Sequence, residues 1–168
     1  MKTRRLVFLA ILTAISLTIY FVEAQIPLPI PVAGVKLGLA NIVTLFALCL
    51  LGPLDALAIL ILRCTLGSIF TGQLISFLYS IAGGLLSFLV MLLGRKVTTD
   101  QQIFVVSILG AIAHNLGQIA VAILLTSTPG LLVYLPILMI SGILSGTFTG
   151  IAAQYLIAHL RSLRKNFL

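Results

Sequence analysis

Charged residues are scarce in this sequence. Of its 168 residues only 8% are charged and 61% are hydrophobic, and the mean hydropathy is +1.28. A soluble domain of ordinary composition has roughly a quarter of its residues charged. The rarest are the acids, which number only three: Glu23, Asp55 and Asp100. Such a chain cannot cover itself with a water-facing surface, so its surface must face lipid.

The shortage of acids also excludes several kinds of enzyme. Mg²⁺-dependent diphosphate chemistry needs several carboxylates around the metal, and none are paired here. There is no glycine loop followed by lysine of the kind that binds ATP phosphates. The two cysteines, Cys49 and Cys64, lie inside apolar segments without metal-ligand spacing, which indicates packing residues. We therefore expect neither catalysis, nor a cofactor, nor a metal site.

The apolar sequence divides into segments of membrane-spanning length. A spanning helix needs about 20 apolar residues, and turn-forming residues interrupt the apolar runs at positions 52–53, 71–72, 94–96 and 129–130. The sequence predicts an all-α fold, an integral membrane six-helix bundle, with one transmembrane domain over residues 1–168. The predicted helices cover approximately residues 6–24, 38–51, 54–70, 74–93, 103–125 and 131–160.

The basic residues indicate how these helices are oriented. They gather at residues 2–5, 95–96 and 161–165, and with six spans all three clusters fall on one side. The loops of the other side hold only Lys36. Because basic residues are enriched in cytoplasmic loops, we expect a multi-pass protein of the cell membrane with both termini in the cytoplasm. The net charge of +7 is not gathered into a stripe, which argues against nucleic-acid binding.

The first 24 residues have a second interpretation. A basic start, an apolar stretch and a Val-x-Ala ending are also typical of a cleaved signal peptide. The apolar run is longer than the roughly 7 to 15 residues of a signal core. Removal would also leave five spans, whose basic clusters would then conflict with the first cluster. We interpret the segment as a retained helix.

The segment between the first two predicted helices, Gln25 to Lys36, is apolar but cannot be regular. Pro27, Pro29 and Pro31 at alternate positions exclude both a helix and a central strand. Non-helical backbone at membrane depth is tolerated where it is buried or lines a cavity. A lid or plug over a cavity is one interpretation, and a plain interfacial loop is the other.

Arg63 lies in the middle of the uncharged run of residues 56–70. An arginine near the membrane midplane costs at least about 2.5 kcal/mol, and such residues usually face a protein interior or a watery cavity. Helical rise places it at a depth similar to that of the polar stretch of the fifth helix. We expect a group of candidate binding residues at this depth, with Lys36 at the mouth of the cavity. Its members are Arg63, His114, Asn115 and Gln118, with contributions from Asn41, Tyr79 and Lys36.

Two roles are open for these polar residues. They can bond to one another and to backbone carbonyls and so hold the helices together. Alternatively, they can bind a ligand. Arg63 favours binding, because Asp55 is expected near the cytoplasmic end and Glu23 near the outer end, so no carboxylate is expected at its depth. An arginine without an acidic partner requires an anionic or carbonyl-rich ligand.

Small residues predict where helices pack closely. Gly142, Gly146 and Gly150 are spaced four apart on the sixth predicted helix, and small residues also recur along the fourth. We assign both to bundle packing.

Three stretches carry a resemblance to a known family. Val35–Asn41 (VKLGLAN), Tyr79–Gly84 (YSIAGG) and Ala113–Gln118 (AHNLGQ) resemble the so-called Gx transporter family. Its members are also labelled heptaprenyl diphosphate synthase component I. The size, the six helices and the apolar first loop are similar to the substrate-binding (S) components of energy-coupling factor (ECF) transporters.

This resemblance implies a function and partners. The first loop would gate a small molecule captured from outside, such as a vitamin, a flavin-like compound or a quinone or isoprenoid precursor. Ala10 and Ala14, an AxxxA pair in the first helix, would dock on a scaffold (T) subunit, and separate ATPase subunits would power release. The alternative is a non-catalytic membrane subunit that assists a heptaprenyl diphosphate synthase, since nothing here resembles the acid-rich motif of prenyl synthases.

Overall fold

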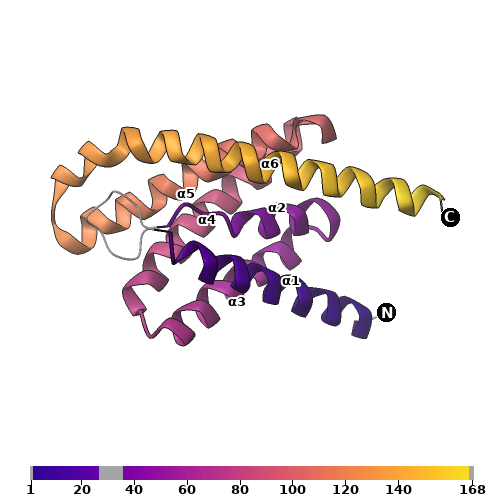
Figure 1. Ribbon diagram of the computed structural model, residues 1–168, viewed down its shortest axis with the longest axis horizontal. Helices are drawn as coiled ribbons and strands as arrows, with labels where there is room; N and C mark the ends of the chain where they lie inside the picture. Colours follow the sequence, from indigo (N-terminus) through magenta and orange to yellow (C-terminus); the bar gives the residue numbers. More distant parts are fainter. Residues whose placement is uncertain (1, 27–35, 167–168) are drawn as a thin grey trace.

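The computed structural model describes residues 2–26 and 36–166, and the side chains of residues 3–26 and 36–161. Within these ranges the chain is helical and has no strand, which confirms the predicted all-α, six-helix fold. Residues 27–35, most of the predicted lid or plug, lie outside the described residues. The α-helices, drawn in Figure 1, are α1 (Lys2–Glu23), α2 (Asn41–Leu50), α3 (Pro53–Thr71), α4 (Leu74–Val97), α5 (Ile103–Thr126) and α6 (Leu135–Asn166). Short 3₁₀ helices precede the last two, η1 (Asp100–Gln102) before α5 and η2 (Pro129–Tyr134) before α6.

Local sequence signals account for where these helices begin and end. Gly52 has a φ of 103°, and Pro53 then begins α3 at a position where its missing N–H does no harm. Gly72 ends α3 in the left-handed conformation. The second helix begins at Asn41 rather than at the predicted residue 38, because Gly38 has a φ of 83° and breaks the helical path. The last helix begins at Leu135, since residues 129–134 form the 3₁₀ turn η2.

The short helix α2 lies at the centre of the bundle. It contacts each of the other five α-helices, and seven of its ten residues are buried. On one side of it α1 packs against α3, and on the other α5 packs against both α4 and α6 (Figure 1). The two groups also meet directly where α3 contacts α4.

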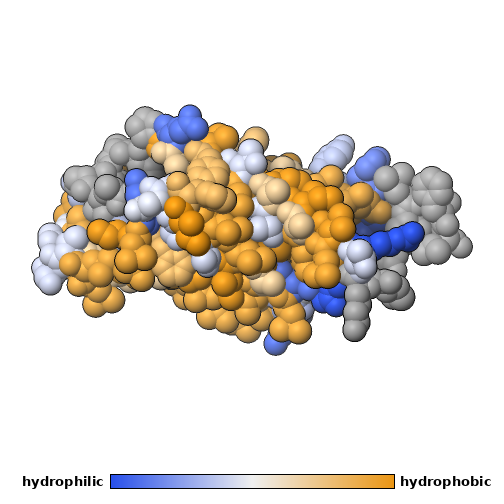
Figure 2. Space-filling view, turned by 90° about the horizontal axis from the view of Figure 1, so that it is seen from below, coloured by the Kyte–Doolittle hydropathy of each residue, from blue (hydrophilic) through white to orange (hydrophobic). Residues whose placement is uncertain are grey.

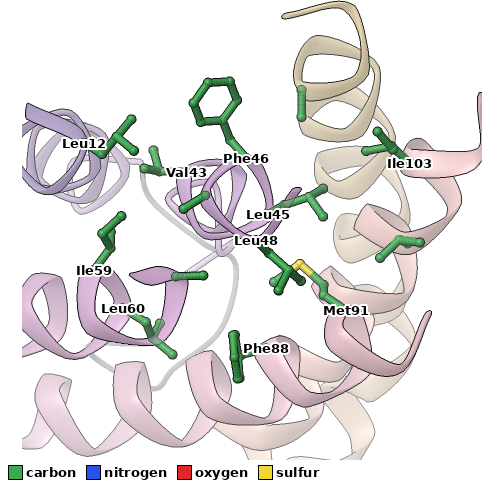
Figure 3. Packing of buried hydrophobic residues seen from close by; sticks show 14 of the residues in the cluster. Leu12, Val43, Leu45, Phe46, Leu48, Ile59, Leu60, Phe88, Met91 and Ile103 are labelled. Carbon is green, nitrogen blue, oxygen red and sulfur yellow. The ribbon is translucent and has the colours of Figure 1, made fainter. Parts of the chain in front are cut away.

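The apolar core surrounds α2. Leu48 of α2 lies beside Met91 of α4, and Leu45 of α2 points towards Ile103 of α5 (Figure 3). Leu60 of α3 and Phe88 of α4 belong to the same core. Lipid tails are as apolar as these side chains, so the core is stabilised by close packing more than by removal from water. This packing fixes the position of α2, whose first residue belongs to the site described below.

Glycines bring α5 close to its neighbours. A Cβ on Gly146 would lie 2.7 Å from the Cα of Ile108, and one on Gly150 would lie 2.6 Å from the Cα of Phe104. On the α4 side, a Cβ on Gly117 would lie 2.8 Å from the Cα of Gly83. These contacts leave no room for a side chain, and they agree with the packing role predicted for the small residues.

The surface is that of a multi-pass membrane protein. Five of the described helices are long and apolar enough to cross a membrane, and α2, with ten residues, spans only about 15 Å. Apolar side chains cover the middle of the molecule in Figure 2, and hydrophilic residues gather towards its right-hand end. Both chain termini lie at that same end (Figure 1).

Candidate binding site

Arg63 is held inside the bundle by α3. Its side chain is only 3% exposed, on the buried face that α3 presents to its neighbours. The Nη2 atom donates a hydrogen bond to Oδ1 of Asn41, 3.2 Å away at the start of α2. The Nε atom has no partner among the described residues. The guanidinium is therefore buried, anchored at one point, and not fully satisfied.

Two residues of α5 lie in the same cluster. His114 and Gln118 are four residues apart, so they share one face of the helix, and both are buried. That face meets Gly83 of α4, where a Cβ would lie 2.9 Å from both His114 Nδ1 and Gln118 Cγ. It also meets Gly38, where a Cβ would lie 2.7 Å from His114 Cδ2. Both glycines let backbone approach the imidazole closely.

The segment Lys36–Ala40, which leads into α2, is tied to helices on both sides. The backbone N–H of Lys36 donates to Gln118 Oε1 at 3.2 Å. The carboxylate of Glu23, at the end of α1, accepts the N–H of Gly38 on one oxygen and that of Ala40 on the other. These bonds fix the backbone immediately before Asn41.

The side chain of Lys36 is placed by an aromatic ring. Its Nζ lies 3.0 Å from the centroid of the Tyr20 ring, a cation–π contact. The ring rests on Gly67 of α3, where a Cβ would lie 2.7 Å from the ring edge, and the Tyr20 hydroxyl lies 3.3 Å from Ser76 Oγ. Gly67 follows Arg63 by one helical turn, so both lie on the same face of α3. The ammonium of Lys36, through its contact with Tyr20, and the guanidinium of Arg63 therefore lie beside that one face. Lys36 is 7% exposed and is thus buried rather than at an open mouth.

Glu23 lies closer to Arg63 than the sequence suggested. It ends α1, as expected for an acid near the outer end, but it is 3% exposed and close enough to Arg63 to interact electrostatically. Its oxygens are nevertheless used by the backbone of the Lys36–Ala40 segment. None of the ion pairs in the described part of the chain includes Arg63 or Glu23. Arg63 therefore has an acid nearby but none in contact.

Several polar atoms of this cluster have no hydrogen-bond partner among the described residues. Buried polar groups are almost always satisfied, so a concentration of exceptions leaves donors and acceptors available to water or to a ligand. The buried surroundings also raise the energetic cost of leaving them unpaired. The unsatisfied atoms are Asn41 Nδ2, Arg63 Nε, His114 Nδ1 and Gln118 Nε2.

Two residues predicted for the site lie elsewhere in the structure. Asn115 follows His114 but points to α6, where its Nδ2 donates to the carbonyl of Leu138 at 2.6 Å. Tyr79 packs in an apolar cluster with Ile119 and Leu131 between α4, α5 and η2. The structure thus brings together Arg63, His114, Gln118, Asn41 and Lys36, and leaves Asn115 and Tyr79 at helix–helix contacts.

Two residues of this region were not predicted. Glu23 and Tyr20 both lie in the last turn of α1. Glu23 was detectable as the lone acid of the outer half, but its reach to the backbone after the loop depends on tertiary structure. Tyr20 carried no sequence signal that distinguished it from the other apolar residues of its helix.

The sequence of the chain matches a described family over most of its length. Residues 12–156 match the family described as heptaprenyl diphosphate synthase component I. The chain belongs to this family. The predicted family is thereby confirmed. None of the curated proteins matches the sequence significantly.

The fold of this family member is similar to that of a transporter component. A solved structure described as the S component of a bacterial ECF transporter superposes with a TM-score of 0.56 at 18% sequence identity, covering 99% of this chain and 98% of the other. The predicted likeness to ECF S components is confirmed for the fold.

The predicted docking residues of α1 face outwards. Ala10 and Ala14 are both exposed, and they line an apolar groove of about 530 Å³ between α1 and α3. Its remaining lining residues are Leu6, Leu9, Thr13, Leu17, Leu62, Leu66 and Phe70. On the α1 side the two alanines lie among the larger side chains Leu6, Leu9, Thr13 and Leu17.

The end of the molecule that carries the termini has its own charged residues, which we call the charged end. Asp55 accepts two hydrogen bonds from Arg5, at 3.0 and 2.6 Å. Asp100 binds Arg95 at 2.9 Å and also binds Arg161, which donates a further bond to the carbonyl of Cys49 near the end of α2. Both acids of this end are therefore paired with arginine.

Proposed function

We propose that this protein is the substrate-binding (S) component of an ECF-type uptake transporter, and that the cluster around Arg63 binds its substrate. The observation that carries the proposal is the set of buried, unpaired hydrogen-bonding atoms around a buried guanidinium. The S-component fold supports it.

The chemistry of the cluster indicates an anionic or carbonyl-rich ligand. Arg63 and Lys36 supply positive charge in surroundings of low dielectric, where electrostatic attraction is stronger than in water. The amide nitrogens of Asn41 and Gln118 supply hydrogen-bond donors, and His114 donates or accepts according to its tautomer. A vitamin, a flavin-like compound or a quinone or isoprenoid precursor has the required groups. Asn115 and Tyr79 would support the helices that carry these residues.

Transport would require further subunits, because this chain has no means of its own to use ATP. The sequence has no ATP-binding loop, so separate ATPase subunits would power release, with a scaffold (T) subunit docked on the Ala10–Ala14 face of α1. The segment Gln25 to Lys36 would gate entry from outside. The basic clusters favour an orientation with both termini in the cytoplasm.

A second candidate function rests on the family description. A heptaprenyl diphosphate synthase component I could be a non-catalytic membrane subunit associated with a soluble synthase. The two functions differ in what accompanies the protein: a transporter component binds a scaffold and ATPases, whereas the accessory subunit binds an acid-rich synthase.

Gentle purification from native membranes followed by native mass spectrometry tests the proposal. We expect the wild-type protein to carry a small molecule and to co-purify with a scaffold and ATPases. Arg63→Ala should stay folded but bind that molecule roughly 100-fold more weakly, because truncating a buried charged partner removes charge-assisted hydrogen bonds. Arg95→Ala, which removes an arginine at the charged end, is the matched control and should bind normally. Unchanged binding by Arg63→Ala would contradict the site, and co-purification of a synthase would favour the second function.

A further inference from the structure

The charge of the binding site can be counted from the buried charged side chains. In the described part of the chain these are Glu23, Lys36, Asp55 and Arg63. Asp55 belongs to the charged end, where it is paired with Arg5. The other three lie in or beside the cluster around Arg63, so the site holds two cations and one acid.

The surroundings of Glu23 favour the ionised form of its carboxyl group, and we count it as one negative charge. Both oxygens accept backbone N–H groups, one from Gly38 and one from Ala40. A carboxylate accepts well on both oxygens, whereas the hydroxyl oxygen of a protonated carboxyl group is a poorer acceptor. Hydrogen bonds to the charged form also stabilise that form.

Lys36 and Arg63 are the two uncompensated cations. The Lys36 ammonium faces the Tyr20 ring, which attracts a cation but carries no net charge. The guanidinium of Arg63 bonds to a neutral amide. With Glu23 counted against them, the buried site has a net charge of one positive unit.

We propose that the substrate bound here is a monoanion, recognised through a carboxylate, and not a diphosphate. This inference rests on the proposed function and narrows its substrate class. In a buried site one negative charge balances the net positive unit, whereas a diphosphate carries more than one negative charge at neutral pH and would leave the excess buried and unpaired.

The unpaired atoms fit a carboxylate group in kind as well as in charge. Arg63 Nε, Asn41 Nδ2 and Gln118 Nε2 are all N–H donors, and a carboxylate is an acceptor with two oxygens. The fourth unpaired atom of the cluster, His114 Nδ1, is a donor in one of the two neutral tautomers. Arg63 presents its donors in a planar fork suited to such an acceptor. Asn115 Oδ1, an unpaired amide oxygen that can only accept, lies on the other side of α5 towards α6.

Thermal-shift titrations of the full chain in detergent test this inference. The probes are sodium acetate and benzoate as monoanions, benzamide as a neutral analogue of benzoate, and inorganic pyrophosphate and isopentenyl diphosphate as diphosphates, all at one ionic strength. We expect the monoanions to stabilise wild-type protein more than benzamide or either diphosphate. Arg63→Gln should weaken the benzoate effect roughly 10- to 100-fold.

Charge-changing variants separate charge from shape. Lys36→Gln brings the site to zero and should remove the preference for benzoate over benzamide, while Lys36→Arg keeps the charge and the preference. Glu23→Gln adds a positive unit and should improve diphosphate binding relative to benzoate by about tenfold. Unliganded melting temperature and size-exclusion profile establish that each variant is folded.

The possible failures can be told apart. Tighter, Arg63-dependent binding of a diphosphate by wild-type protein overturns the monoanion inference and leaves the proposed capture site standing. Absence of any Arg63-dependent monoanion effect also overturns the inference. The proposed function is decided separately, by the partners and ligand found in native membranes.

Discussion

The charged end and the cluster around Arg63 use the same residue types in opposite ways. At the charged end Asp55 and Asp100 are each in contact with arginine, and one partner of each ion pair is well exposed to solvent. In the cluster, Arg63 and Lys36 are buried and neither contacts a carboxylate among the described residues. Charged side chains therefore form ion pairs at the charged end, whereas the two cations of the cluster have no carboxylate in contact.

Exposed ion pairs contribute little to stability, and each can be lost at small cost. Buried groups without partners lower stability, so a folded protein keeps them only where another interaction requires them. The ion pairs of the charged end are thus suited to orienting the protein in the membrane and to holding helix ends in place. The cluster around Arg63 is suited to binding a ligand. Substitutions in both regions test this contrast, and we order them by the size of the effect expected.

Removing Glu23 should have the largest effect. Glu23→Ala leaves the buried N–H groups of Gly38 and Ala40 without acceptors, and unsatisfied buried groups cost about 1–3 kcal/mol each. We expect a loss of about 2–4 kcal/mol on this basis, together with weaker ligand binding as the Lys36–Ala40 segment loosens. Unfolding by denaturant in detergent measures the first, and ligand retention the second. Glu23→Gln, which keeps one acceptor oxygen, is the control and should lose less. A Glu23→Ala protein as stable as wild type would show that the carboxylate does not hold this segment.

Asn115 and Gln118 allow a structural residue and a candidate binding residue to be compared on the same helix, α5. Asn115→Ala removes the bond to the Leu138 carbonyl, so we expect a loss of about 1 kcal/mol in stability and unchanged ligand binding. Gln118→Ala should instead reduce ligand binding, because Gln118 lies in the cluster. Native mass spectrometry and thermal melting of both variants separate these effects. Loss of ligand from Asn115→Ala at normal stability would restore the ligand role that the sequence suggested for it.

The smallest effect is expected at the charged end. Asp100→Asn removes the carboxylate that Arg95 and Arg161 contact, and the Asp100 side chain is 54% exposed. The melting temperature should fall only slightly, and the difference from wild type should shrink as salt is added, because salt screens exposed pairs. Ligand binding should not change. A large fall in melting temperature that does not depend on salt would show that these ion pairs behave like buried charges, as in the cluster around Arg63.

Much of the fold was predictable from the sequence. Turn residues such as Gly52, Pro53 and Gly72 interrupt apolar runs at the helix boundaries, and the glycines of α6 pack against α5 as their spacing indicated. The start of α2 was misplaced because a positive φ at Gly38 cannot be distinguished in sequence from an ordinary helical glycine.

The candidate site was only partly predictable. Arg63, His114 and Gln118 can be recognised in the sequence because they are polar residues in apolar helices. Helical periodicity puts the last two on one face. Periodicity could not decide which way Asn115 points, since adjacent residues differ by about 100° around a helix and either can face a partner. Nor could it bring Glu23 to the Lys36–Ala40 segment, because that contact joins α1 to backbone 15 residues later in the sequence.

The shortness of α2 has a consequence for how the protein is made. Ten residues are too few to enter a bilayer as an independent spanning segment, and Asn41 and Thr44 would be poorly tolerated against lipid. Its burial depends on helices up to α6, which the ribosome produces last. We therefore expect the second helix of the chain to reach its final place only after synthesis of the sixth.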